Sequence, residues 1–144
     1  MFLWPLKKKN NKSDEERIFG KDVNSDLDFL LKECKERLPN IDQQLIKKAF
    51  HWSVEAHKDK VRKSGDPAYT HPLAVAHIVV VEMPLDDISV ACALLHDTIN
   101  GSQTYSIKDI QSEFGSTIAE IVDNITKIFN IESREIVRHE IIPF

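Results

Sequence analysis

The dipeptide His96-Asp97 ends an apolar run and places two side chains that can bind a metal ion next to each other. A neutral imidazole and a carboxylate oxygen suit a first-row divalent cation such as manganese, iron or zinc. The three residues after Thr98, which are Ile99, Asn100 and Gly101, contain no carboxylate, so none of them can accept a proton from water. The sequence therefore predicts a metal site that has no general base beside it.

A second group of polar residues lies upstream, in the stretch VRKSGDPAYTHP. His71 follows a loop that contains glycine and proline, and it stands at the expected start of a helix, where its side chain can reach a ligand. Arg62, Lys63 and Ser64 precede it closely. Two cations and a hydroxyl beside a metal site are typical of a pocket for a phosphate or a nucleotide. Taken singly, Arg62 and Lys63 also fit a solvated charged turn, and that alternative stays open.

The elements that must position these residues are predicted to be helices. Apolar side chains recur at helical spacing in six segments and in a last short pattern: 25–38, 41–60, 72–83, 86–97, 106–115, 118–129 and 136–141. Asp86 or Asp87 is expected to cap the fourth segment. Ser106 with Asp109 resembles a capping box for the fifth, which Gly115 should end.

The stretch HIVVV is the one place where a strand competes with a helix. Its β-branched residues favour a strand by propensity, but residues 72–83 also fit a buried helix, and no partner strand is visible in the sequence. We therefore predict an all-α fold, a bundle of six or seven helices. The helix that ends at Asp97 should be central, with the 118–129 stripe packed on it.

Composition limits the class of protein. A chain of 144 residues fits one domain, and 42% hydrophobic with 29% charged residues is ordinary for a soluble globular protein. A net charge of −4 argues against a nucleic-acid surface. Residues 1–22 are polar and aperiodic, so we expect a flexible tail followed by one domain over 23–144, with no membrane span. Cys34 and Cys92 lack a C-x-x-C spacing, which favours reduced thiols in a cytoplasmic protein.

The order of the motifs resembles the N-terminal HD domain of the RelA/SpoT homologues, which make and degrade the alarmone (p)ppGpp. The similarity covers about residues 45–128. The family shows an R-K-S-G-E-P-Y-x-x-H-P segment, an L-L-H-D helix end, an F-G turn and a V-D-G-x-T-K-L stretch. The matching segments here are residues 62–72, 94–97, 114–115 and 122–128.

The resemblance implies two groups of site residues and a reaction. The positions that bind manganese in the family are His71, His96 and Asp97 here. The positions that hold the guanine nucleotide are Arg62, Lys63 and Ser64. In the hydrolases of the family, a metal-activated water cleaves the 3′-pyrophosphate of (p)ppGpp, because the metal lowers the pKa of the water and screens the phosphate charge.

Two departures from the family bear on activity. Active hydrolases read H-D-x-x-E-D-T after the metal pair, and their Glu-Asp pair orients and deprotonates the water. Asn100, Gly101 and Ser102 stand at the last three of those positions, and loss of such a group costs ~10²- to 10⁴-fold in rate. The family's fourth metal ligand is an aspartate in a later L-A-D-R-L-H-N stretch that this sequence lacks, so we expect a domain that is truncated at its C-terminal side. Ala68 also replaces a family tyrosine.

Three interpretations of these residues stay open. The chain is a (p)ppGpp hydrolase of weak or altered activity, with Asn100 as a degenerate catalytic position. Alternatively it is a non-catalytic module that binds a nucleotide or a partner. In the third, it is a fragment whose missing portion completed the site. The sequence does not decide the metal or the oligomeric state.

Overall fold

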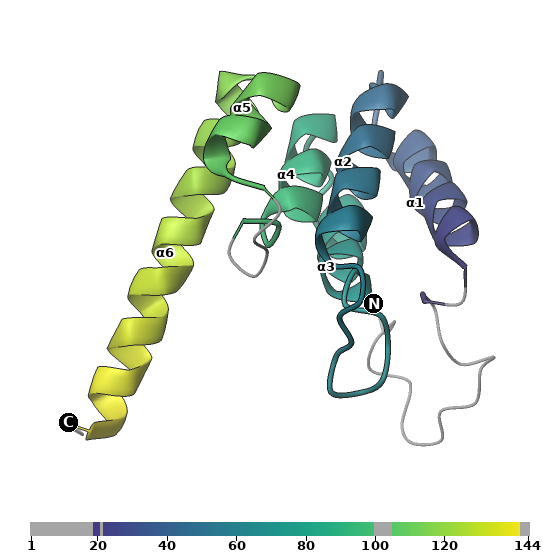
Figure 1. Ribbon diagram of the computed structural model, residues 1–144. Coiled ribbons are helices and arrows are strands. Elements are labelled where there is room, and N and C mark those ends of the chain that lie inside the picture. The colour runs from purple at the N-terminus through teal and green to yellow at the C-terminus, as the bar shows by residue number, and fades with distance from the viewer. Residues whose placement is uncertain (1–18, 21, 100–104, 142–144) are drawn as a thin grey trace.

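The computed structural model describes residues 19–20, 22–99 and 105–141, with side chains as far as Ile128. Six α-helices make up most of that part of the chain (Figure 1): α1 (Val23–Arg37), α2 (Gln43–Ala56), α3 (Thr70–Glu82), α4 (Asp87–Leu95), α5 (Ile107–Phe114) and α6 (Ser116–Ile141). An isolated bridge joins Val61 to Pro67, and the described residues form no strand. The HIVVV stretch lies within α3. The all-α prediction is confirmed.

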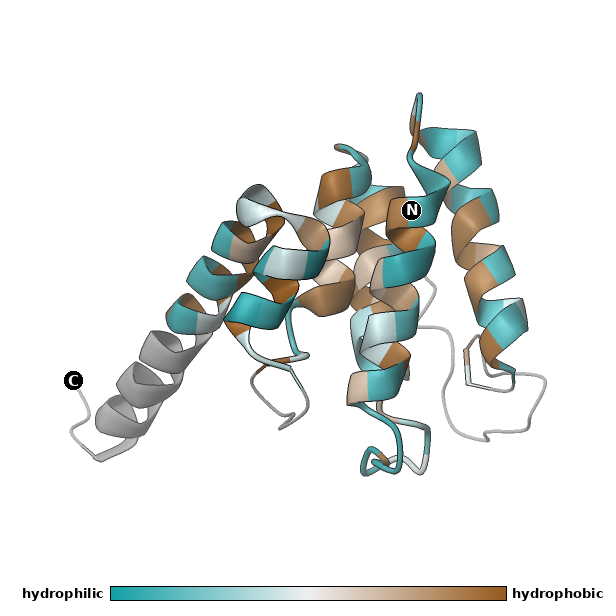
Figure 2. Cartoon of the chain, turned by 45° about the horizontal axis from the view of Figure 1, so that its top comes forward, coloured by the Kyte–Doolittle hydropathy of each residue, from teal (hydrophilic) through white to brown (hydrophobic). Residues whose placement is uncertain are grey.

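Helix α4 occupies the centre of the bundle. It packs against α2 and α3 on one side and against α6 on the other (Figure 1). Its last six residues, from Val90 to Leu95, are all buried. In Figure 2 the hydrophobic residues gather on the inner faces of the helices, whereas the loop between α2 and α3 is hydrophilic. The predicted central position of this helix is confirmed, and so is the packing of α6 on it.

Side-chain caps explain where several helices begin. The Asp86 carboxylate accepts a hydrogen bond from the backbone N–H of Ser89, so Asp86 is the cap of α4. At α5, Ser106 and Asp109 form the complete capping box. Gly115 ends α5 with a φ of 95°, a conformation that glycine adopts without strain. Each of these three features follows the sequence prediction.

Two helix boundaries differ from the prediction by more than two residues. Helix α2 ends at Ala56 rather than near Lys60, because the chain turns there and Asp59 takes a φ of 66°. The segments 118–129 and 136–141 are one helix, α6, of 26 residues. No glycine or proline interrupts α6, so the change in apolar pattern after Phe129 does not stop the helix. Its C-terminal part extends beyond the other helices (Figure 1).

The bundle includes residues that precede α1. Phe19 is buried and makes edge contacts with Phe29 of α1 and His77 of α3. Residues 1–18 lie outside the described part of the chain, so the flexible tail stays a prediction. Cys34 and Cys92 are buried, free thiols. Among the described helices, none combines the length and the apolar character needed to cross a membrane.

Candidate metal centre

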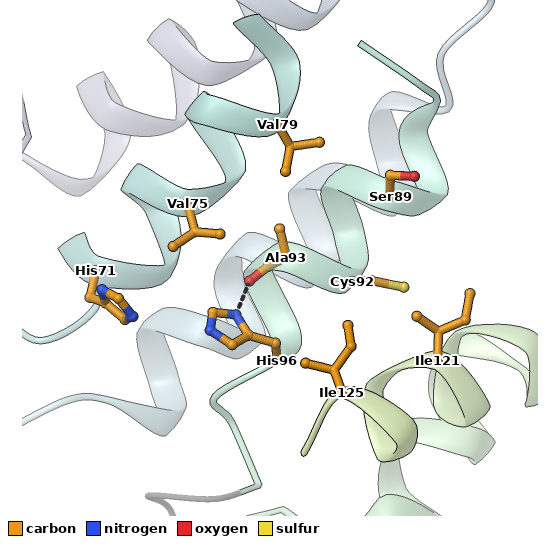
Figure 3. Close-up of a pocket in the computed structure, with 9 residues that line it drawn as sticks. All are labelled: His71, Val75, Val79, Ser89, Cys92, Ala93, His96, Ile121 and Ile125. Atoms are coloured by element: carbon orange, nitrogen blue, oxygen red, sulfur yellow. Dashed lines mark hydrogen bonds between the residues drawn. The ribbon is translucent and has the colours of Figure 1, made fainter. Parts of the chain in front are cut away.

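His96 lies at the C-terminal end of α4 with its ring almost fully buried. Its Nδ1 atom lies 2.6 Å from the backbone oxygen of Ala93 (Figure 3). A carbonyl oxygen can only accept, so Nδ1 carries the proton and Nε2 carries the lone pair. The Nε2 atom of His96, which is the nitrogen that can bind a metal, is therefore turned away from α4.

Asp97 joins the two histidines. Its Oδ1 atom lies 3.6 Å from Nε2 of His96, and its Oδ2 atom lies 3.6 Å from Nε2 of His71. One ligand atom from each of these three residues lies within 4.8 Å of the other two. The structure thus brings together the three predicted metal ligands, two from the end of α4 and one from the start of α3, although 25 residues separate His71 from His96.

His71 is held by the turn that opens α3. Its backbone N–H donates to the oxygen of Ala68, and the hydroxyl of Thr70 donates to the oxygen of Pro67 at 2.7 Å. Partial burial lowers the pKa of His71, and the nearby charge of Arg62 lowers it further, whereas Asp97 opposes both effects. The lowered pKa favours the neutral imidazole, which is the form that binds a metal.

The three side chains could hold a single divalent cation, because one ligand atom from each lies within 4.8 Å of the other two. Ligand atoms held at about 2.1 Å by one tetrahedral ion lie about 3.4 Å from each other. The two 3.6 Å contacts of Asp97 use a different oxygen for each histidine. Two imidazole nitrogens and one carboxylate oxygen suit manganese, iron or zinc. Three protein ligands also leave a position for water, as in many catalytic metal sites. Within the described residues, this is the one such cluster of three.

A pocket of about 400 Å³ opens beside the cluster, between α3, α4 and α6. His71 and His96 stand at one end, and the other walls are mostly apolar (Figure 3): Val75, Val79, Ser89, Cys92, Ala93, Ile121 and Ile125. Sequence analysis did not predict this pocket. Its walls come from three helices, and the spacing within each helix does not tell which apolar positions face an opening.

The residues predicted to bind a nucleotide lie on an exposed turn before α3. Arg62 closes this turn through backbone hydrogen bonds with Gly65 and Asp66. The Ser64 hydroxyl donates to the Asp66 carboxylate at 2.9 Å. Arg62 and Lys63 are both exposed to solvent, and the charge of Arg62 lowers the pKa of His71. The turn thus lies close enough to His71 for the charge of Arg62 to change the pKa of His71. The side chains of the turn lie outside the metal cluster.

The degenerate catalytic position lies in a segment that the structure leaves undescribed. Asn100, Gly101 and Ser102 all fall within residues 100–104. The first described residue after them, Tyr105, stacks on Trp52 of α2 with ring centroids 4.1 Å apart. The proposed role of Asn100 therefore remains a prediction from the sequence.

Comparison with known proteins places the chain in a family. Residues 49–140 match the HD domain family. GTP pyrophosphokinase rsh of Brucella melitensis is 35% identical over 103 residues, which are 72% of this chain and 14% of that protein.

Two further relatives carry similar names. A probable GTP pyrophosphokinase of Mycobacterium leprae is 37% identical over 94 residues, or 65% of this chain and 12% of the relative. The GTP pyrophosphokinase of Myxococcus xanthus is 41% identical over 90 residues, or 62% of this chain and 12% of the relative. The chain thus spans only a small part of the curated relatives it matches. It belongs to the HD domain family, and its HD domain is that of a RelA/SpoT homologue.

Proposed function

We propose that this chain is a (p)ppGpp-binding HD domain of stringent-response metabolism, with a manganese ion at its centre and weak or lost 3′-pyrophosphate hydrolysis. The observation that carries the proposal is the convergence of His71, His96 and Asp97, whose ligand atoms lie within 4.8 Å of one another. The membership of the family supports a guanine nucleotide as the ligand. The free, buried cysteines fit a reducing cytoplasmic setting.

Each part of the ligand has a matching group on the chain. His71, His96 and Asp97 would hold the cation, which when bound lowers the pKa of a water and screens phosphate charge. His96 keeps its nitrogen in place through the bond to Ala93. Arg62 and Lys63 offer charge to the phosphates, and Ser64 offers a hydroxyl. The pocket beside the histidines offers mostly apolar walls to a bound ligand.

Hydrolysis needs a second group that accepts a proton from the attacking water. The matching positions hold Asn100 and Gly101, and neither can act as a base. Asp97 is the carboxylate of the described cluster, and it would be occupied as a ligand of the cation. We therefore propose binding as the main function, with hydrolysis reduced by ~10²- to 10⁴-fold relative to a complete site. The alternative is a regulatory module that binds a partner through the same face.

The names of the relatives describe the synthesis of the alarmone rather than its hydrolysis. Those names apply to proteins of which this chain spans only 12% to 14%. We do not transfer the pyrophosphokinase activity to this chain. The proposal concerns the HD region alone.

Calorimetric titration with Mn²⁺, and then with (p)ppGpp in the presence of Mn²⁺, tests the proposal. His96→Ala should abolish Mn²⁺ binding, because it removes a ligand whose ring is already fixed. His51→Ala is the matched control, since His51 is an exposed histidine of α2 outside the cluster. Mn²⁺ binding that survives His96→Ala would refute the metal site.

Substitution on the exposed turn tests the nucleotide. Arg62→Ala should weaken (p)ppGpp binding and leave Mn²⁺ binding intact, because Arg62 lies outside the metal cluster. Lys127→Ala removes an exposed cation of α6 that pairs with Asp123, and it serves as the control. Equal (p)ppGpp affinity of both variants would remove the turn from the proposed site.

A further inference from the structure

A buried hydrogen bond connects α1 to the segment that carries His71. The hydroxyl of Tyr69 donates to Oδ2 of Asp26 at 2.6 Å, and both residues are less than 8% exposed. The same Oδ2 atom accepts the backbone N–H of Gly20 at 3.0 Å. One carboxylate oxygen of Asp26 therefore accepts hydrogen bonds from both the chain before α1 and the start of α3.

Tyr69 is the cap residue of α3, two positions before His71. Its backbone oxygen accepts the N–H of Leu73, and its ring meets Phe50 of α2 edge-on at 6.0 Å. No side chain caps α3 at this end. The hydrogen bond of the Tyr69 side chain therefore connects the N-terminal end of α3, two residues before His71, to α1.

A second contact supports the same connection. Gly20 packs against the His71 segment so closely that an added Cβ would lie 3.4 Å from Thr70 and 3.5 Å from Pro67. Its φ of 106° also favours glycine. The chain before α1 therefore lies directly on the residues that open α3.

From these contacts we infer that Asp26, acting through Tyr69, is a positioning residue for His71. The inference rests on the proposed function in one respect, that His71 binds the metal. The family tyrosine falls at Ala68, and Asp26 precedes the residues 49–140 that match the family. Burial raises the pKa of Tyr69, and so does the hydrogen bond to Asp26, so the phenol keeps its proton and remains a donor.

The test compares Mn²⁺ affinity among variants of the full chain. Tyr69→Phe keeps the ring but removes the donor, and it should weaken Mn²⁺ binding by about tenfold, the lower end of the effect seen for residues that orient metal ligands. Asp26→Leu should act in the same way. Asp26→Asn keeps an oxygen acceptor, so this variant should retain most of the affinity that Asp26→Leu loses. The absorption spectrum of bound Co²⁺ should change in Tyr69→Phe, whereas Asp26→Asn should give nearly the spectrum of the unaltered chain.

Asp42→Ala is the control for lost stability, because Asp42 caps α2, which carries none of the three ligands. It should lower the melting temperature and leave Mn²⁺ affinity unchanged. If Asp26→Leu does not fold, Tyr69→Phe decides the question. A folded Tyr69→Phe variant with unchanged Mn²⁺ affinity and an unchanged Co²⁺ spectrum would overturn the inference.

A measurement without metal separates the inference from the proposed function. If the unaltered chain takes up no Mn²⁺, the proposed function fails. The position of His71 is still measured by the NMR resonances of its ring in the metal-free chain. Tyr69→Phe should shift or broaden the His71 resonances and leave those of His51 unchanged. Unmoved His71 resonances would overturn the positioning role whatever the outcome with metal.

Discussion

His77 and His71 belong to the same helix, α3, but their side chains lie in different environments. His71 faces the pocket, whereas His77 is buried towards α1, with its ring 5.7 Å from that of Phe19 and 5.2 Å from that of Phe29. Burial lowers the pKa of His77, Glu33 opposes this effect, and Arg37 adds to it. His77 therefore stays neutral in the folded protein at pH values where a free histidine is protonated.

This lowered pKa predicts a loss of stability in acid. Above 6.5, the ordinary histidine pKa, both states are neutral. As the pH falls below 6.5, the unfolded chain binds a proton that folded His77 does not, so the free energy of unfolding decreases. The decrease ends below the folded pKa. His77→Phe should reduce the difference in urea midpoint between pH 7 and pH 5.

His51→Phe provides the comparison for this measurement, because His51 is exposed. It should leave the difference between the two pH values nearly unchanged. His71 also has a lowered pKa, so some acid sensitivity will remain in His77→Phe. An equal loss of stability in His77→Phe and in the unaltered chain would contradict the assignment.

Asn100 and Gly101, the third and fourth residues after Asp97, predict the rate of hydrolysis. The unaltered chain should release negligible pyrophosphate from (p)ppGpp in the presence of Mn²⁺, because Asn100 and Gly101 supply no base. Asn100→Glu combined with Gly101→Asp should raise the rate only if Mn²⁺ binds to the three ligands. The double variant with His96→Ala is the control. Rapid pyrophosphate release by the unaltered chain would show that these carboxylates are dispensable.

At the scale of helices, local signals predict beginnings and ends best. Asp86, the Ser106 capping box and Gly115 were predictable, because a cap depends on residues within one turn. The end of α2 was not predictable, because it depends on the left-handed conformation of Asp59, for which the sequence carries only a weak signal. The length of α6 was underestimated, because an apolar pattern reports burial and not the continuity of a helix.

The capping box of α5 gives a prediction at this scale. Ser106→Ala removes the hydroxyl that accepts the N–H of Asp109, and it should lower the free energy of unfolding by about 1 kcal/mol. Ser112→Ala changes an exposed serine within the same helix and should cost nothing measurable. Urea unfolding of both variants measures the difference. Equal stability of the two would mean that the cap contributes little.

The candidate site was predictable only in its ligands. His71, His96 and Asp97 carry a motif whose spacing is visible in the sequence, and the structure brings them together. The connection between Asp26 and Tyr69 was not predicted, because 43 residues separate the two and a single buried aspartate leaves no periodic pattern. The residues that position the ligands of a site are brought together by tertiary packing, and a single sequence does not show which distant residues are in contact.

For the whole molecule, the ligand set predicts a connection between metal and stability. His71 comes from α3 and the other two ligands from the turn that ends α4, so a bound ion would join two helices that unfolding separates. Free Mn²⁺ at 100 times its dissociation constant should stabilise the fold by about 2.7 kcal/mol. Thermal melting should show this as a rise in melting temperature. His96→Ala should show no rise, and a rise of equal size would indicate that the ion binds elsewhere.

The two buried cysteines make the order of unfolding measurable by chemical labelling. Burial raises the pKa of Cys34, on α1, to about 12 and that of Cys92, on α4, to about 11. A thiol with such a pKa is almost wholly protonated at pH 8, and an alkylating reagent reacts only with the thiolate. Each cysteine should therefore react only after the packing around it has opened: around α1 for Cys34, and around the pocket that Cys92 lines. Because α1 lies at the edge of the bundle and α4 at its centre, Cys34 should be labelled first under native conditions.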